Sequence, residues 1–341
     1  VWDLKRRPTI NDVARLAEVS KKTVSRVINQ SPLVNEETRQ KIAKVIDDIG
    51  YEPDPQARGL ASQRSFLLGI IYDNPNSQYV VNVQAGILEA CRKSGFELVV
   101  HPCIRTSPTY MKEMRQFVER QKLDGVILLP PLSEDEALAA MLTEIGCRFI
   151  RVACVPLDVA AQLVVYEDYK GAAEVADHLV ELGHRRIGFI AGTPQYKSAQ
   201  ERRRGFADGL ARHGLSLDPE LYAQGAYTFE SGQECAEKLL SMKNPPTAIF
   251  ACNDEMAAGV YRVAFKKGIA IPQELTVVGF DDSQLALRMC PALSTVRSPV
   301  RDMGRTAAEK LIQRIAQPDA KLRETIFQPH LVVRESSGPV R

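Results

Sequence analysis

The chain has 341 residues, of which 45% are hydrophobic and 25% charged, and its formal net charge is only +2. This length exceeds one ordinary domain, and the composition excludes a disordered or fibrous protein. No apolar run approaches the roughly 20 residues that a membrane span needs, and no leader with a cleavage site is recognisable. We therefore expect a cytoplasmic protein of two or three domains without a membrane partner.

Two short helices joined by a brief turn are predicted at the start of the chain. Thr9 is a favourable N-cap for apolar residues that recur at helical spacing up to Ala17. After a break at Glu18, Ser20 caps a second periodic run. Basic residues on the outer side of this run are typical of a helix-turn-helix. The turn position held by Glu18 usually favours glycine, because a left-handed backbone costs other residues about 1 kcal/mol.

A third helix and a proline-marked link follow. Asn35 starts an apolar-periodic run that Gly50 stops, and this helix would cover the first two. The link opens a helix-capable segment at residues 56–62. Residues 1–64 contain twelve Lys and Arg against nine Asp and Glu, whereas the remainder is nearly neutral. A mildly basic N-terminal segment suits an electrostatic contact with DNA.

From Phe66 onward, short apolar runs alternate with helical patterns. The expected strands read F-L-L-G-I-I-Y, E-L-V-V-H-P, G-V-I-L-L-P, R-F-I-R-V, R-R-I-G-F-I-A-G, T-A-I-F-A-C-N and L-T-V-V-G-F-D. Helical patterns separate them, for example at residues 84–93, 172–182 and 256–267. Continuous hydrophobicity indicates strands covered on both faces, hence parallel sheets flanked by helices. The number of strands favours two similar α/β lobes.

Polar residues follow several of these strands, and none of the common catalytic motifs is present. Ligands of doubly wound sheets bind at the carboxyl ends of strands, where the chain has Asp73, the pair Asn253-Asp254, and Asp281. Without a nucleophile and base pair, such side chains suit hydrogen bonds to a polyol, so we expect a binding protein and not an enzyme. Because Asp and Asn also cap helices, we favour capping for Asp254 and ligand contact for Asn253 and Asp281.

Seven cysteines are scattered along the chain and never stand at C-x-x-C spacing, so neither a disulfide framework nor a zinc site is expected. His178 and His184 are at no spacing typical of metal ligands. We expect no metal and no cofactor.

These motifs resemble those of the lactose-repressor/galactose-repressor (LacI/GalR) family of transcription regulators. In the N-terminal segment they read T-I-N-D-V-A, V-S-K-K-T-V-S-R-V-I-N, N-E-E-T-R, G-Y-E-P and A-R-G-L-A. Further along they read S-A-Q-E-R-R-R-G-F, A-C-N-D-E-M-A-A-G, V-G-F-D-D and P-A-L-S-T-V-R-S-P, the last resembling the strand that returns to the first lobe. The resemblance spans the whole chain. It implies an N-terminal all-α helix-turn-helix head with a hinge helix, followed by a two-lobed α/β domain with parallel doubly wound sheets, like periplasmic binding proteins.

The implied boundaries are a head at 1–53, a hinge helix and linker at 54–64, and an effector-binding and dimerisation domain at 65–341. The first lobe is expected at about 65–163 and 294–321, and the second at about 164–293 and 322–341. A homodimer is expected, because a palindromic operator needs two heads.

The resemblance also assigns roles in the head. Lys21, Lys22 and Arg26 would face base edges in the major groove of operator DNA, where Lys and Arg suit guanine O6 and N7. Polar side chains would contact phosphates and set the register, namely those of Thr9, Ser20, Thr23, Ser25 and Asn29. Residues 56–62, including Arg58, would fold into a hinge helix only on DNA, with Leu60 wedged into a minor-groove step.

The effector would lie between the two lobes, in contact with Asp73, Tyr79, Ser198, Arg202, Tyr227, Asn253 and Asp281. Arg202 matches the motif R-x-x-G-[FY], whose arginine reaches a sugar's hydroxyls, and Tyr227 falls where the family keeps an aromatic residue. Many members have an aspartate at the end of the strand that reads R-F-I-R-V here. This chain instead has Ala153, with Arg151 and Cys154 beside it, so a different pocket is expected.

The expected function is a sequence-specific DNA-binding transcription regulator, a repressor of carbohydrate-utilisation genes that a sugar inducer releases from its operator. Two alternatives remain open. The same fold can take a purine or another corepressor, since Arg202 and Asp281 would serve either ligand. The chain could instead be a sugar-binding module without a regulatory role, against which the basic head argues.

Overall fold

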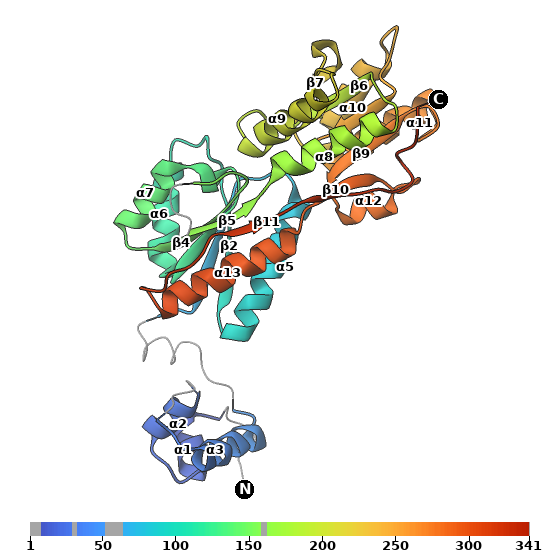
Figure 1. The fold of residues 1–341 in the computed structure, drawn as a ribbon. Coiled ribbons are helices and arrows are strands. Elements are labelled where there is room, and N and C mark those ends of the chain that lie inside the picture. The colour runs from blue at the N-terminus through green and yellow to red at the C-terminus, as the bar shows by residue number, and fades with distance from the viewer. Residues whose placement is uncertain (1–7, 29–32, 52–63, 158–161, 341) are drawn as a thin grey trace. The chain divides into compact units, whose positions relative to one another are not determined.

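The computed structural model describes residues 8–28, 33–51, 64–157 and 162–340. The chain divides into two compact units, Val1–Phe66 and Leu67–Arg341, and each is described by itself (Figure 1). Within the described ranges, no helix is long and apolar enough to cross a membrane.

The N-terminal unit contains the predicted helices α1 (Ile10–Leu16), α2 (Lys21–Ile28) and α3 (Glu36–Ile49). Two of the expected caps are confirmed by hydrogen bonds. Ser20 Oγ accepts the Thr23 N–H at 3.1 Å, and Asn35 Oδ1 accepts the Thr38 N–H at 2.9 Å. The apolar faces of the three helices meet in a cluster that includes the fully buried Ile42. The helix-turn-helix and its covering third helix are therefore confirmed.

The turn between α1 and α2 has the strained backbone that the sequence predicts. Glu18 has φ 54, a left-handed conformation that costs a non-glycine residue about 1 kcal/mol. Its side chain is 82% exposed and forms an ion pair with the exposed Lys41, a type of contact that contributes little to stability.

We expect Glu18→Gly to stabilise the N-terminal unit by roughly 0.5–1 kcal/mol, because glycine removes the backbone strain. Slower amide hydrogen exchange of α1 and α2 in the full chain would measure the gain. Glu18→Ala is the matched control, since it removes the same ion pair and keeps the strain. Equal exchange rates in the two variants would show that the strain is unimportant.

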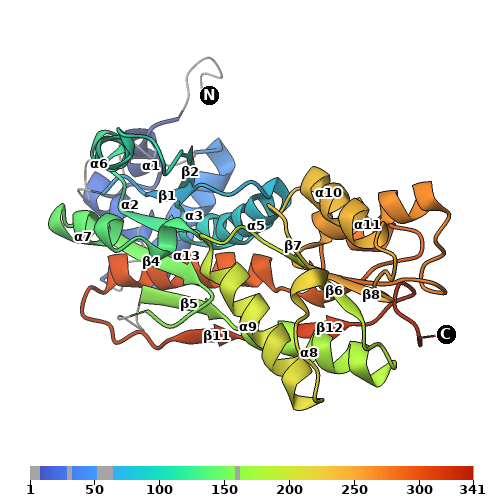
Figure 2. The ribbon, with the colours of Figure 1, turned by 90° about the horizontal axis from the view of Figure 1, so that it is seen from above.

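The C-terminal unit consists of two lobes, each built on a sheet flanked by helices (Figures 1 and 2). The first sheet has the order β11 (Thr325–Phe327), β5 (Leu163–Tyr166), β4 (Arg148–Ala153), β3 (Gly125–Leu128), β1 (Leu67–Tyr72) and β2 (Glu97–Pro102). The second has the order β12 (His330–Val332), β10 (Ser294–Arg297), β9 (Thr276–Asp281), β8 (Ala248–Ala251), β6 (Ile187–Ala191) and β7 (Tyr222–Gln224). The pairings are parallel except that β12 runs antiparallel to β10.

Helices connect these strands. Those of the first lobe are α5 (Ser77–Ser94), α6 (Tyr110–Gln121), α7 (Glu136–Glu144) and α13 (Val300–Ala316), with a 3-10 turn, η1, at Leu132–Glu134. Those of the second are α8 (Asp168–Glu181), α9 (Lys197–Arg212), α10 (Phe229–Leu240), α11 (Asp254–Lys267) and α12 (Gln284–Arg288), with η3 at Pro219–Leu221.

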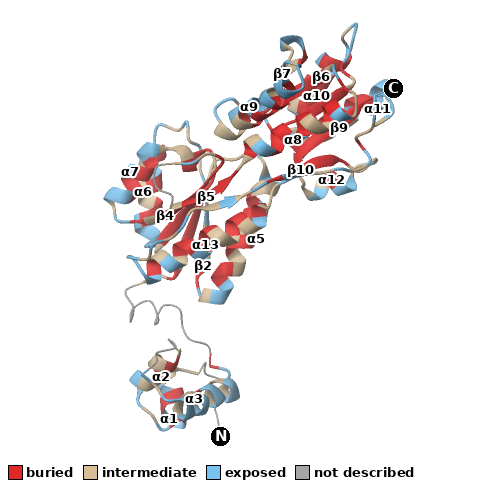
Figure 3. Ribbon diagram, viewed as in Figure 1, coloured by how far each residue is buried: buried red, intermediate tan, exposed pale blue. Residues whose placement is uncertain are grey.

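The seven strands predicted from continuous hydrophobicity are present as β1, β2, β3, β4, β6, β8 and β9. Strands such as β3 and β6 are buried along their whole length, and Figure 3 shows buried residues along both sheets. Helices on both faces of a parallel sheet leave no wet face, so hydrophobicity does not alternate. The expected helical patterns coincide with α5, α8 and α11, which begin two to seven residues earlier, and the pattern at 172–182 ends one residue beyond α8.

The crossings between the lobes differ from the expected boundaries. Residues 163–166 form β5, which pairs with β4, so the first lobe extends to Tyr166. Residues 294–297, expected in the first lobe, form β10 and pair with β9 in the second. Residues 325–327, expected in the second lobe, form β11 and pair with β5 in the first. The expected assignment is wrong at these strands, because the hydrophobicity of a short strand does not reveal which sheet edge it joins.

Candidate functional site

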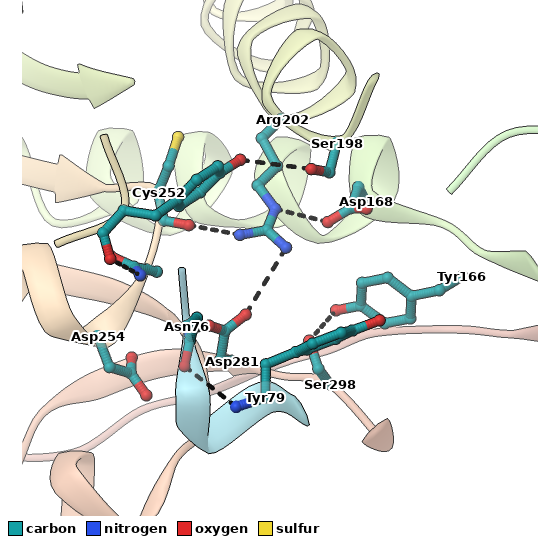
Figure 4. Close-up of polar contacts among 12 residues, drawn as sticks. Asn76, Tyr79, Tyr166, Asp168, Ser198, Arg202, Cys252, Asp254, Asp281 and Ser298 are labelled. Atoms are coloured by element: carbon teal, nitrogen blue, oxygen red, sulfur yellow. Dashed lines mark hydrogen bonds and ion pairs between the residues drawn. The ribbon is translucent and has the colours of Figure 1, made fainter. Parts of the chain in front are cut away.

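A cavity lies between the two lobes of the C-terminal unit, at the carboxyl ends of several strands (Figure 4). Its empty space measures about 610 Å³, which includes space open to solvent. The lining residues are Asn74, Asn76, Tyr79, Pro130, Val152, Ala153, Cys154, Tyr166, Asp168, Tyr196, Ser198, Arg202, Tyr227, Asp281, Ser298, Val300 and Met303.

Arg202 on α9 organises the polar side of this cavity. Its Nε donates to Asp168 Oδ1 at 2.5 Å, its Nη1 donates to the carbonyl oxygen of Cys252, and its Nη2 lies 3.6 Å from Asp281 Oδ1. The guanidinium also lies 3.7 Å from the ring centre of Phe280. These negative partners raise the pKa of Arg202 even though the residue is buried. The arginine therefore stays charged and fixed in direction.

The two carboxylates beside Arg202 are positioned by the ends of secondary-structure elements. Asp168 is the first residue of α8 and is 2% exposed. Asp281 ends β9 with φ 111, an unusual conformation for a residue with a side chain. Asn76 Nδ2 donates to Asp281 Oδ2 at 3.3 Å. Burial raises the pKa of both carboxyls, that of Asp281 to about 8, while Arg202 lowers them in part.

Four tyrosines surround these charges. Ser298 Oγ donates to Tyr166 Oη at 2.8 Å, which fixes that ring in the wall of the cavity (Figure 4). The rings of Tyr196 and Tyr227 lie 5.7 Å apart, at a tilt of 38°. Tyr196 also donates its hydroxyl to the carbonyl oxygen of Asp73 at 3.0 Å, a hydrogen bond from the second lobe to the first.

Five of the seven predicted effector residues line the cavity, namely Tyr79, Ser198, Arg202, Tyr227 and Asp281. Asp73 does not, because its carboxylate accepts the Arg105 N–H at 3.0 Å; the neighbouring Asn74 and Asn76 line the cavity instead. Contact of these residues with an effector stays a prediction.

Asn253 caps α11 in place of the expected Asp254, and neither residue lines the cavity. Asn253 caps α11, since its Oδ1 accepts the Met256 N–H at 2.9 Å, and its Nδ2 donates to the carbonyl oxygen of Tyr227 at 2.9 Å. It is not among the residues lining the cavity. Asp254 is buried one residue further on, where it accepts hydrogen bonds from Thr295 Oγ1 at 2.6 Å and the Ser283 N–H at 2.7 Å. Asn253 therefore orients Tyr227 and the helix, and Asp254 is not the cap.

Sequence reasoning missed several lining residues. Asp168 and Tyr166 flank the crossing into the second lobe, and Asn76, Tyr196 and Ser298 lie on connecting segments. The position of Asp168 just after β5 could have identified it, because that strand is also a short apolar run.

The end of β4 is the place at which the sequence predicts a pocket different from that of many family members. Ala153 and Cys154 line the cavity. Arg151 instead pairs with Glu136 on α7, at 2.8 and 3.0 Å, and is not among the lining residues. The end of β4 therefore gives the cavity an apolar wall.

In the N-terminal unit, the predicted DNA contacts that the structure describes lie on or next to α2, except Thr9, which precedes α1. Lys21 and Lys22 are exposed and Arg26 is partly buried. Thr9, Thr23 and Ser25 are partly buried, and Ser20 is exposed. Asn29, Arg58 and Leu60 lie outside the described residues, as does nearly all of the expected hinge.

The described residues contain no group of three or more His, Cys, Asp and Glu that could hold a metal ion. The seven cysteines are free. Both nitrogens of His184 are engaged in the core, with Thr247 Oγ1 at 2.9 Å and the Gly338 carbonyl oxygen at 3.0 Å. This histidine is a structural residue.

Comparison with known proteins gives two family matches. Residues 9–54 match the model described as bacterial regulatory proteins, lacI family, and residues 176–337 match the periplasmic binding protein-like domain. The ribose operon repressor of Haemophilus influenzae is 30% identical over 328 residues, which cover 96% of this chain and 98% of that protein.

Two solved structures are similar over nearly the whole chain. A complex of the transcriptional regulator CelR with cellobiose has a TM-score of 0.72 and 31% identity, and the match covers 97% of this chain and 100% of that one. A Lac repressor dimer bound to operator and the anti-inducer ONPF has a TM-score of 0.78 and 27% identity, covering 98% and 100%.

Proposed function

The chain belongs to the lacI family of bacterial regulatory proteins, and we propose that it represses carbohydrate-utilisation genes until a sugar binds between its two lobes. It acts as a homodimer on operator DNA in the cytoplasm, where the chromosome lies. The cavity is the observation that carries the effector half of this proposal. Arg202, two carboxylates and several hydroxyls converge there on a space between tyrosine rings, and sugars are bound by such polar groups and aromatic faces.

The relatives support a sugar more than the alternative corepressor. The name of one relative refers to ribose, and a solved relative contains cellobiose. The helix-turn-helix favours a DNA-binding regulator over a sugar-binding module that does not bind DNA, because its second helix has two exposed lysines.

In the proposed switch, the C-terminal unit has two conformations that differ in the angle between its lobes, and the sugar binds one of them more tightly than the other. A ligand shifts a two-state equilibrium only through such a difference in affinity. The altered angle between the lobes would disfavour the hinge helices at residues 56–62 and release the operator. The hinge lies outside the described residues, so its folding on DNA, including the wedge at Leu60, stays a prediction.

Arg26→Ala tests the proposed base contact. We expect a loss of about 1–3 kcal/mol on the operator and a smaller loss on random duplex DNA, because the arginine reads a guanine edge. Fluorescence anisotropy measures both affinities. The operator is a duplex that the chain selects from a random pool, and the second DNA is an unselected duplex.

Lys44→Ala is the matched control, since it removes an exposed positive charge of α3, outside the recognition helix. It should leave the ratio of operator to random affinity unchanged. Equal losses on the two DNAs in Arg26→Ala would mean that Arg26 contacts phosphate only.

A further inference from the structure

The charges that line the cavity are unevenly balanced. Arg202 is the one cationic side chain among the described lining residues, and Asp168 and Asp281 are the two carboxylates. Asp168 takes the close contact with Arg202, at 2.5 Å, whereas Asp281 is 3.6 Å away from it. The guanidinium of Arg202 therefore pairs mainly with Asp168, and its ion pair with Asp281 is the weaker of the two.

Beyond Arg202, no cationic side chain lines the cavity beside Asp281 among the described residues. The side-chain amide of Asn76, which is neutral, donates a hydrogen bond to the Asp281 carboxylate at 3.3 Å. Burial raises the pKa of Asp281 to about 8; Arg202 lowers this pKa in part, and the negative charges of Asp254, Asp168 and Glu255 raise it further. A carboxyl in this setting favours a cationic partner, because a positive charge would offset both the burial and the repulsion.

The remaining walls are compatible with a cation. Tyr79, Tyr166, Tyr196 and Tyr227 line the same cavity, and the electron-rich face of an aromatic ring attracts a positive charge. On the side of β4 the wall is Ala153 and Cys154, where no charged group lines the cavity. An anionic ligand would meet two carboxylates and would have to compete with Asp168 for Arg202.

We propose that the effector presents an ammonium group to Asp281, so that the site takes amino sugars and rejects sugar acids and sugar phosphates. This inference rests on the proposed sugar effector and narrows its class. The ring hydroxyls would be left to Arg202, Asn76 and the tyrosine and serine hydroxyls of the cavity.

Calorimetry on the full chain with ring-matched sets of sugars tests the inference. Each set, of gluco, galacto, manno or ribo configuration, contains the amino sugar, its N-acetyl derivative, the neutral sugar, the sugar acid and the sugar phosphate. The amino sugar of the recognised configuration should bind roughly 10- to 100-fold more tightly than its neutral and N-acetyl counterparts, the range of a buried charge-assisted hydrogen bond. The acid and phosphate should bind most weakly.

Asp281→Asn should remove most of this preference, since the amide carries no charge. Asp208→Asn is the matched control, because it makes the same change at an exposed site on the helix that bears Arg202, and it should keep the preference. If Asp281→Asn fails to fold, the comparison of amino and N-acetyl sugars on the unmodified chain decides alone.

Tighter binding of a neutral or acidic sugar than of its amino counterpart would overturn the inference and leave the sugar effector in place. Binding of no sugar of any set would overturn the sugar effector and the amino-sugar inference with it.

Discussion

Replacing Arg202 by methionine is expected to lower the free energy of unfolding of the C-terminal unit by about 3–5 kcal/mol. The substitution keeps most of the apolar volume but leaves Asp168 and Asp281 buried without their cation. It also leaves the carbonyl oxygen of Cys252 without the donor supplied by the guanidinium. Denaturant unfolding followed by circular dichroism measures the loss.

The loss should be larger at pH 8 than at pH 5. A buried carboxyl whose folded pKa is raised holds a proton that the unfolded chain releases above about pH 4, so its folded state is favoured at low pH and loses stability as pH rises through the folded pKa. In the unmodified chain Asp281 already has a pKa of about 8. Without Arg202 the pKa values of Asp281 and Asp168 rise further, and the stability falls more steeply with pH.

Arg204→Met is the control for this experiment. Arg204 lies on the same helix, and its side chain is 61% exposed and pairs with Glu201, so its loss should cost less than about 1 kcal/mol. A destabilisation by Arg202→Met that is equally small, or that does not change between the two pH values, would contradict the role of Arg202 as the counter-charge of the site.

The second large effect concerns the response to the effector. Asp281→Ala should bind operator as the unmodified chain does, yet lose most of the 5- to 150-fold change in affinity that a coupling of 1–3 kcal/mol gives. The reason is that Asp281 lines the cavity of the C-terminal unit, whereas the proposed DNA contacts belong to the N-terminal unit. Operator titrations with and without the tightest-binding sugar from the ring-matched sets measure this change.

Asp208→Asn serves again as the control and should respond to the sugar normally. An Asp281→Ala protein that remains fully responsive would remove Asp281 from the effector site. A variant that no longer binds operator at all would mean that Asp281 acts on the stability of the fold and not on the ligand.

The N-terminal helices could be predicted because their signals are local. A cap such as Ser20, a stop at Gly50 and apolar residues at helical spacing each act within a few positions, and even the left-handed turn at Glu18 followed from its place in the motif. The buried strands could be predicted for the same reason, since continuous hydrophobicity is a property of each segment. The pairing of these strands into sheets is not a local property. The lobe to which β10 or β11 belongs depends on the distant strand with which it pairs.

The site was predictable in part. Arg202 and Asp281 were found from a motif and from their position at a strand end, but Asp168 was missed because β5, the short apolar run before it, was not among the expected strands. The helix cap was expected at Asp254 and is Asn253, because a shift of one residue in the start of α11 decides which side chain caps the helix. Sequence patterns rarely place a helix start to that accuracy.

The most direct test of the account is the affinity of the full, unmodified chain for its selected operator duplex, measured by fluorescence anisotropy with and without the sugar that calorimetry shows to bind. We expect the sugar at saturation to weaken operator binding by roughly 5- to 150-fold. Unchanged or tighter operator binding in the presence of that bound sugar would contradict it.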